Sequence, residues 1–222
     1  MIITIDGPAG TGKSTVAQQV AERIGFDFLD TGAMYRAVGL EAVRRQANLQ
    51  DARELASMVK HCHIRFDWNQ KPPSLLLNDE LVGHLLRGSD VTRAASLVAT
   101  VPAVRRQLVK EQQQIGREHP KLLTEGRDQG TVVFPQAELK VYLDATPQER
   151  ARRRMAQLRL RGEAVEPADV LSEIMERDQR DAGRATGPLA VPRDAVVIDT
   201  TSITSEQVVD EIVRHARQRG AA

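Results

Sequence analysis

An eight-residue glycine-rich segment near the N-terminus constrains the fold of this chain more than any other feature. The segment reads GPAGTGKS over residues 7–14 and follows the short apolar run IITI at residues 2–5. It matches the G-x-x-x-x-G-K-[ST] pattern, in which a loop between a strand and a helix points backbone N–H groups at phosphate oxygens. Residues 14–24 then place apolar side chains at four-residue spacing, which predicts the helix that the pattern requires. We therefore expect an α/β domain that binds a polyphosphate, and a glycine-rich turn without a ligand is the weaker interpretation.

Two side chains of this segment have predicted roles beside a polyphosphate. Lys13 can reach the β- and γ-phosphate oxygens, and the hydroxyl group of Ser14 can hold a Mg²⁺ ion. The segment therefore predicts a bound nucleotide accompanied by magnesium.

The composition narrows the class of protein further. The chain has 222 residues, which suits one α/β domain with an insertion, and its 41% hydrophobic residues are enough for a packed core. Aromatic residues make up only 3%, which argues against a platform that stacks single-stranded bases. The net charge of +1 gives no general attraction to nucleic acid or to an anionic membrane. We therefore expect a small-molecule ligand.

The cysteine content and the lengths of the apolar runs indicate in which cellular compartment the protein is expected. Cys62 is the only cysteine, so no intrachain disulfide can form and a reducing compartment is expected. The N-terminus lacks a basic segment followed by a long apolar run, and no apolar stretch approaches the length of a membrane span. These features predict a cytoplasmic protein.

Strands and helices are predicted to alternate along most of the chain, which implies a mainly parallel sheet flanked by helices. Strands are expected at residues 2–5, 26–29, 122–125, 139–143 and 195–198, and helices at 14–24, 33–45, 51–61, 103–118, 147–161, 167–180 and 205–219.

One part of the chain breaks this alternation. Residues 63–68, 74–78 and 80–82 predict three short strands with no helix between them, which is typical of an antiparallel sheet. We therefore predict a small inserted subdomain at residues 62–101 and a core formed by residues 1–61 and 102–222.

Further motifs distinguish among nucleotide-binding proteins. The chain lacks the N-K-x-D and D-x-x-G motifs of GTP-binding switches and the LSGGQ signature of transport ATPases. DTGAMYR at residues 30–36 follows a predicted strand and offers a helix N-terminus, a hydroxyl and an arginine, which could clamp a second phosphate or could be a capped helix. EGRDQGT at residues 125–131 also follows a strand, where ligands of open α/β sheets bind. A small phosphotransferase fits these motifs best.

Two arginine clusters remain ambiguous from their spacing alone. Arg150, Arg153 and Arg154 share one helical face, with Arg152 turned away, and this face could be a solvated surface or a lid that neutralises a transferring phosphate. In the second cluster, residues 177–184, the side chains at 177, 181 and 184 share a face if the helix persists, although ordinary ion pairs explain that pattern equally.

Taken in order and spacing, the motifs GPAGTGKS, LDTGAMYR, EGRDQGTVVFP and ERDQRDAGR resemble those of bacterial cytidylate kinases. The resemblance runs from Ile2 to about Gln218 and includes the insertion. Members of this family are nucleoside monophosphate kinases, which transfer the γ-phosphoryl group of ATP to CMP or dCMP. The resemblance implies that residues 62–101 bind the nucleoside monophosphate and that a lid lies at about residues 150–184.

The resemblance also implies the site residues, position by position. ATP would contact Gly7, Pro8, Ala9, Gly10, Thr11, Gly12, Lys13, Ser14 and Thr15, with Ser14 on the metal. CMP would contact Thr31, Arg36, Ser96, Arg105, Arg127, Asp128, Arg177, Asp181 and Arg184. The transfer itself would depend on Lys13, Arg127, Arg153 and Arg177, with Arg154 also in the lid.

The implied base contacts suit cytosine chemically. A carboxylate at Asp128 can accept a hydrogen bond from the 4-amino group, while Arg105 and Arg184 can donate to N3 and O2. Uracil reverses the donor and acceptor at positions 3 and 4, so it would leave buried groups unpaired. An ionised Asp181 can accept from ribose hydroxyls without requiring the 2′-hydroxyl, which allows dCMP.

Two positions depart from the family's usual pattern. Thr31 replaces a serine and keeps the hydroxyl group, whereas Glu125 replaces an aspartate and reaches one methylene further.

Alternative functions are a kinase for another small acceptor such as UMP or dTMP, and a nucleotide-binding protein that transfers nothing. We expect a monomer, because no segment of the sequence marks an interface.

Overall fold

The computed structural model describes residues 1–221 and divides into two compact units. The first unit contains Met1–Phe26 and the chain from Lys121 onward, and the second contains Asp27–Pro120. The predicted insertion, residues 62–101, falls within the second unit, which extends beyond it on both sides.

The first unit is built on parallel strands, as predicted. β1 (Ile2–Asp6) lies between β6 (Leu122–Gly126) and β7 (Leu139–Asp144), and β8 (Val196–Asp199) pairs with the far side of β7. Because the strands run in one direction, their carboxyl ends meet at one edge of the sheet, where Asp6 lies in register with Gly126. This edge carries the glycine-rich loop.

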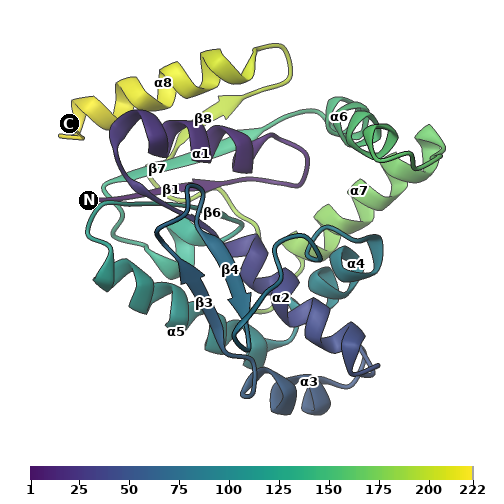
Figure 1. Cartoon of the computed structure of the whole chain (residues 1–222). Coiled ribbons are helices and arrows are strands. Elements are labelled where there is room, and N and C mark those ends of the chain that lie inside the picture. The colour runs from purple at the N-terminus through teal and green to yellow at the C-terminus, as the bar shows by residue number, and fades with distance from the viewer. Residues whose placement is uncertain (222) are drawn as a thin grey trace. The chain divides into compact units, whose positions relative to one another are not determined.

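Helices of the first unit pack in two pairs (Figure 1). Helix α1 (Lys13–Ile24) packs against α8 (Ser205–Gln218), and α6 (Pro147–Leu160) packs against α7 (Pro167–Ala182). Prolines open both α6 and α7, at the position where the missing N–H is not needed. All four helices were predicted within three residues of their observed ends.

The second unit combines helices with a small antiparallel sheet. Its sheet has the order β3-β4-β5, which confirms the predicted antiparallel strands. The elements in chain order are β2 (Asp27–Asp30), α2 (Thr31–Arg44), α3 (Ala52–Val59), β3 (Ile64–Asp67), β4 (Ser74–Leu77), β5 (Glu80–Leu81), α4 (Ser89–Val98) and α5 (Pro102–Glu118).

Helix α4 was not predicted. Its buried residues Val91, Ala94, Ala95 and Val98 follow helical spacing. Two of these four are alanines, so the apolar stripe is weak, and no side chain caps the N-terminus of the helix. The sequence signal that usually marks the start of a helix was therefore missing here.

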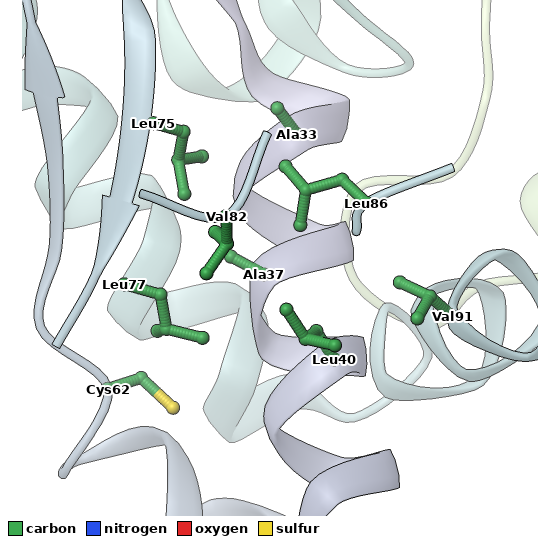
Figure 2. Packing of buried hydrophobic residues seen from close by; sticks show 9 residues of the cluster. All are labelled: Ala33, Ala37, Leu40, Cys62, Leu75, Leu77, Val82, Leu86 and Val91. Carbon is green, nitrogen blue, oxygen red and sulfur yellow. The ribbon is translucent and has the colours of Figure 1, made fainter. Parts of the chain in front are cut away.

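The core of the second unit is formed by side chains from α2, β4 and the segment that leads to α4 (Figure 2). Leu75 and Leu77 point to the same face because residues two apart in a strand share a side. Cys62 lies in this cluster with 5% exposure, and burial raises the pKa of its thiol to about 12. The cysteine is therefore a core residue with an unreactive thiol.

Close packing of α2 against α4 supplies a test of this core. A Cβ atom added at Gly39 would lie 2.8 Å from the backbone nitrogen of Ala95 and 3.0 Å from the carbonyl oxygen of Val91. We expect Gly39→Ala to lower the free energy of unfolding by about 1–3 kcal/mol, because overpacking exceeds the gain in helix propensity of about 1 kcal/mol. Chemical denaturation measures the change. Gly83→Ala is the control, since a Cβ there meets no atom within 4 Å, and equal losses in both variants would contradict the packing.

Two other features complete the fold. A π-helical turn, η1 (Gln129–Val133), follows β6 and was not predicted. Among the described residues, no helix has both the length and the apolar character needed to span a membrane.

Candidate active site

The glycine-rich loop connects β1 to α1, as its sequence predicts. At Gly7 an added Cβ would lie 2.1 Å from the carbonyl oxygen of Leu143, so the loop passes too close to β7 for any side chain. Gly12 caps α1 in a left-handed conformation with φ of 89°, which glycine adopts without strain. The N-terminus of α1 and its unpaired backbone N–H groups therefore belong to the loop, as an anion site requires.

Lys13 is buried at the start of α1. Its side chain is 5% exposed, and its Nζ donates a hydrogen bond to the carbonyl oxygen of Pro8 at 2.7 Å. Burial, together with the nearby positive charge of Arg127, lowers the pKa of Lys13 to about 7, and the negative charge of Glu125 opposes this shift. A bound anion would favour the charged form again, so this environment suits a phosphate.

Ser14 and Glu125 meet between α1 and β6. The Ser14 hydroxyl donates to Oε1 of Glu125 at 2.6 Å, and Glu125 is 4% exposed. Both groups offer the oxygen ligands that magnesium prefers. Within residues 1–221 no group of three or more His, Cys, Asp or Glu side chains is placed to hold a metal. The pair therefore fits a magnesium ion that arrives with phosphates and keeps several waters.

A buried ionic cluster surrounds Asp181 at the end of α7. Nε of Arg127 donates to Oδ2 of Asp181 at 2.9 Å, and Arg184 donates to the other carboxylate oxygen. Asp181 is 1% exposed, and although burial raises its pKa, Arg127, Arg184 and Arg177 together hold the pKa below its ordinary value. The structure thus brings together four of the predicted site residues.

The geometry of this cluster differs in one respect from the expectation. Helix α7 ends at Ala182, so Arg184 lies beyond it and the three side chains do not share one helical face. Arg184 reaches Asp181 from the following turn instead. The helix does not persist to Arg184, so the predicted shared helical face was wrong, but the side chains of Arg184 and Asp181 still meet.

Asp128 lies two residues after the end of β6 and directly before η1, and it is 3% exposed. The neighbouring Asp6, at the end of β1, was missed by the sequence reasoning. Asp6 is fully buried, and burial raises its pKa to about 7 despite hydrogen bonds from two backbone N–H groups. The available signal was an acidic residue that closes an otherwise apolar strand directly before the glycine-rich loop.

The arginines of α6 do not form a uniform solvated face. Arg150 is 4% exposed and donates to Asp178 at 2.6 Å and to the carbonyl oxygen of Ala9 at 3.3 Å. Nη1 of Arg153 donates to the Thr200 hydroxyl at 3.0 Å and to the carbonyl oxygen of Thr11 at 3.4 Å. Two arginines thus connect the start of α6 with the glycine-rich loop.

Arg152 points away from this face, as its spacing predicts. It is exposed and pairs with Glu149, whose pKa is lowered to about 2 by Arg152, with a further contribution from Arg153. This pair is an ordinary surface contact, which contributes little to stability.

In the second unit, the predicted phosphate clamp lies at the start of α2. Asp30 caps this helix by accepting from the backbone nitrogen of Ala33 at 2.9 Å, and it also pairs with Arg36 at 2.6 Å. Thr31 is 2% exposed. A capped helix was one of the two interpretations of this segment, and the pairing of Asp30 with Arg36 was not anticipated.

The remaining predicted residues of the second unit are also buried. Ser96 on α4 is 7% exposed, and its hydroxyl has no hydrogen-bond partner among residues 1–221. Arg105 on α5 is 2% exposed, and its guanidinium lies 5.5 Å from the centre of the Tyr35 ring. The nine positions implied for CMP are thus divided between the two units.

A glycine-rich phosphate loop between β1 and α1 of a parallel sheet defines a P-loop protein of the kinase type. Solved structures share this fold: a gluconokinase from Sinorhizobium meliloti 1021 (TM-score 0.50, 14% identity, 97% of this chain and 91% of that one) and an uncharacterised protein from Eubacterium ventriosum ATCC 27560 (TM-score 0.52, 14% identity, 98% of both chains). Because the sequence identity is low, this structural similarity supports the fold alone.

Other known proteins are much more similar to this chain in sequence than these two structures are. The sequence model of the cytidylate kinase family matches residues 3–218. A cytidylate kinase from Enterobacter sp. (strain 638) is 43% identical over 98% of this chain and 96% of its own length. One from Photorhabdus laumondii is 42% identical over 98% and 95%. The chain therefore belongs to the cytidylate kinase family.

Proposed function

We propose that this chain transfers the γ-phosphoryl group of ATP to CMP or dCMP, giving ADP with CDP or dCDP. One observation of the site supports this most directly. The first unit holds a buried cationic group, Lys13, and a partly buried one, Arg127, which is close enough to lower the pKa of Lys13. Binding of a single nucleotide needs only the first, whereas bringing two anionic phosphates together needs both.

On the donor side, residues 7–15 would hold the ATP phosphates and Lys13 would contact their oxygens. Ser14 would bind Mg²⁺, with Glu125 beside it, as their 2.6 Å hydrogen bond allows. When bound, the ion neutralises negative charge on the phosphates. The link from Arg153 to the glycine-rich loop supports its assignment to the donor side and to a lid at about residues 150–184.

On the acceptor side, the proposed contacts to CMP are those that the resemblance implies. Thr31, Arg36 and Arg127 would bind its phosphate, and Arg177 and Asp181 would bind the sugar or the phosphate. Ser96, Arg105, Asp128 and Arg184 would face cytosine. The buried hydroxyl of Ser96 supports a polar ligand, because an unpaired hydroxyl inside a protein is otherwise unfavourable.

The chemistry requires positioning more than a strong base. The acceptor phosphate is largely ionised near neutral pH, since its second pKa is about 6. Lys13 and the arginines would orient the two substrates in line and neutralise the charge that they share. Closure of residues 62–101 and of the lid would exclude water, which would otherwise hydrolyse ATP.

Release of ADP from ATP in the presence of different acceptors tests this proposal. CMP and dCMP should be the preferred acceptors, with a kcat/KM at least about tenfold above those of UMP and dTMP, because uracil and thymine leave buried polar groups unpaired. Preference for UMP or dTMP would favour the alternative kinase. ATP binding without ADP release for any acceptor would favour a non-catalytic nucleotide-binding protein.

We also propose that the reaction takes place in the cytoplasm and that the protein acts as a monomer. The buried thiol of Cys62, the only cysteine, suits a reducing compartment. Light scattering of the purified protein tests the second statement, since a dimer would show twice the 24.6 kDa mass of the chain.

A further inference from the structure

Asp6 accepts two backbone hydrogen bonds from the turn that follows Asp128. Its Oδ1 accepts from the N–H of Gln129 at 2.8 Å, and its Oδ2 accepts from the N–H of Gly130 at 2.7 Å. The side chain is fully buried at the end of β1, in register with Gly126. One carboxylate thus joins the strand before the glycine-rich loop to the segment that carries Arg127 and Asp128.

The two converging N–H groups require a particular kind of side chain. A carboxylate has two acceptor oxygens and therefore satisfies both donors, whereas an asparagine would turn an NH₂ group toward one of them. Burial opposes the charge, since it raises the pKa of Asp6 to about 7. Asp6 is thus held in an electrostatically unfavourable place by the geometry of this turn.

Other contacts leave the turn little freedom to adopt another arrangement. The Thr124 hydroxyl donates to Oε1 of Gln129 at 3.0 Å. At Gly130 an added Cβ would lie 2.9 Å from both the Thr4 hydroxyl and the Pro192 ring. The turn is therefore fixed on the side of β1 and on the side of β6.

The same turn fixes the backbone of Asp128. The carbonyl oxygen of Asp128 accepts from the N–H groups of Val132 and Val133 at 2.9 and 3.1 Å. The next residue, Gln129, is the one that Asp6 holds. The direction in which the Asp128 side chain leaves the backbone therefore depends on contacts that include Asp6.

We propose that Asp6 is a positioning residue for the acceptor nucleotide: it holds the turn after β6 so that Arg127 and Asp128 face the phosphate and base of a nucleoside monophosphate. This inference rests on the proposed function. It assigns to Asp6 an effect on acceptor binding and base selectivity, although Asp6 touches neither substrate.

Steady-state kinetics of Asp6→Asn test the inference. We expect the KM for CMP to rise at least about tenfold and the preference for CMP over UMP to fall, while the KM for ATP changes less than about threefold. Ile3→Val is the control, because Ile3 is fully buried in the same strand and its side chain has no atom that can accept a hydrogen bond from the turn. It should leave both KM values and the preference unchanged.

A purely structural role would give a different result. Asp6→Asn would then lower the melting temperature with no change in base preference, or would raise the KM values for ATP and CMP equally, and either outcome would overturn the inference. If the wild-type protein prefers an acceptor other than CMP, the proposed function fails, and the same comparison with that acceptor still tests Asp6.

Hydrogen exchange of the wild-type protein gives a test that does not depend on a variant folding. The N–H groups of Gln129 and Gly130 should be protected at least about 100-fold even without CMP, because the carboxylate already binds both. Exchange at the rate of an exposed loop would show that Asp6 does not hold the turn, and would overturn the inference.

Discussion

Lys13→Ala should reduce phosphoryl transfer from ATP to CMP by about 10³-fold or more, since groups that neutralise charge in such transition states contribute effects of this order. Lys13 is buried in the glycine-rich loop, and removal of its charge would leave the transferring phosphate without the contact that we propose. Initial-rate measurements with saturating ATP and CMP give the loss in kcat.

The fold should survive this substitution, because the folded-state pKa of Lys13 is lowered by burial to about 7 from an ordinary value of 10.5. Between these two values the unfolded chain binds a proton that the folded chain has released. The Lys13 amine therefore destabilises the folded state as the pH falls through that range. Removal of the amine also removes this effect, so the melting temperature at pH 8 should not fall greatly.

Lys140→Ala is the matched control, since Lys140 is a partly exposed lysine on β7 outside the proposed site. It should retain nearly full activity. Near-normal turnover of Lys13→Ala would contradict the proposed mechanism, and so would an equal loss in both variants.

Asp128→Asn should lose activity toward CMP more than toward UMP. The carboxylate is proposed to accept from the 4-amino group of cytosine, and an amide can present a donor there instead. We expect kcat/KM for CMP to fall about 10- to 100-fold, because an unpaired buried polar group costs about 1–3 kcal/mol. UMP, which has no amino group, should be affected less, so the preference for CMP should decrease. Parallel assays with CMP, dCMP and UMP measure the change.

Asp194→Asn is a control for the general effect of removing a carboxylate, since Asp194 is exposed in the loop before β8. All three acceptors should react with it as with the wild-type protein. Equal losses for CMP and UMP in Asp128→Asn would refute the assignment of Asp128 to the base, and would favour a role in holding the loop.

Much of the fold could be predicted because the strongest sequence signals are local. The glycine-rich loop, the prolines at helix starts and the Asp30 cap each determine their neighbours' conformation directly. Helix α4 was missed because its apolar stripe depends on alanines and its start lacks a capping side chain.

The parts of the candidate site that escaped prediction depend on contacts between distant positions. The hydrogen bonds of Asp6 join residues 123 and 124 positions apart, and the Arg150 bond to Ala9 spans 141. No spacing rule connects such residues. The spacing of Arg150 was recognised, but its burial against Asp178 follows from the packing of α6 on α7. Motifs therefore indicated the groups that are proposed to face substrates, whereas the contacts that hold those groups in place were visible only in the structure.

Transfer of a labelled phosphate is the most direct measurement. ATP labelled at the γ-position is incubated with the protein, magnesium and CMP, and the products are separated. The label should appear in CDP in equal amount with the ADP formed, and it should disappear from CDP when Lys13→Ala replaces the wild-type protein. Label recovered only in inorganic phosphate, or left in ATP, would contradict a two-substrate kinase that acts on CMP.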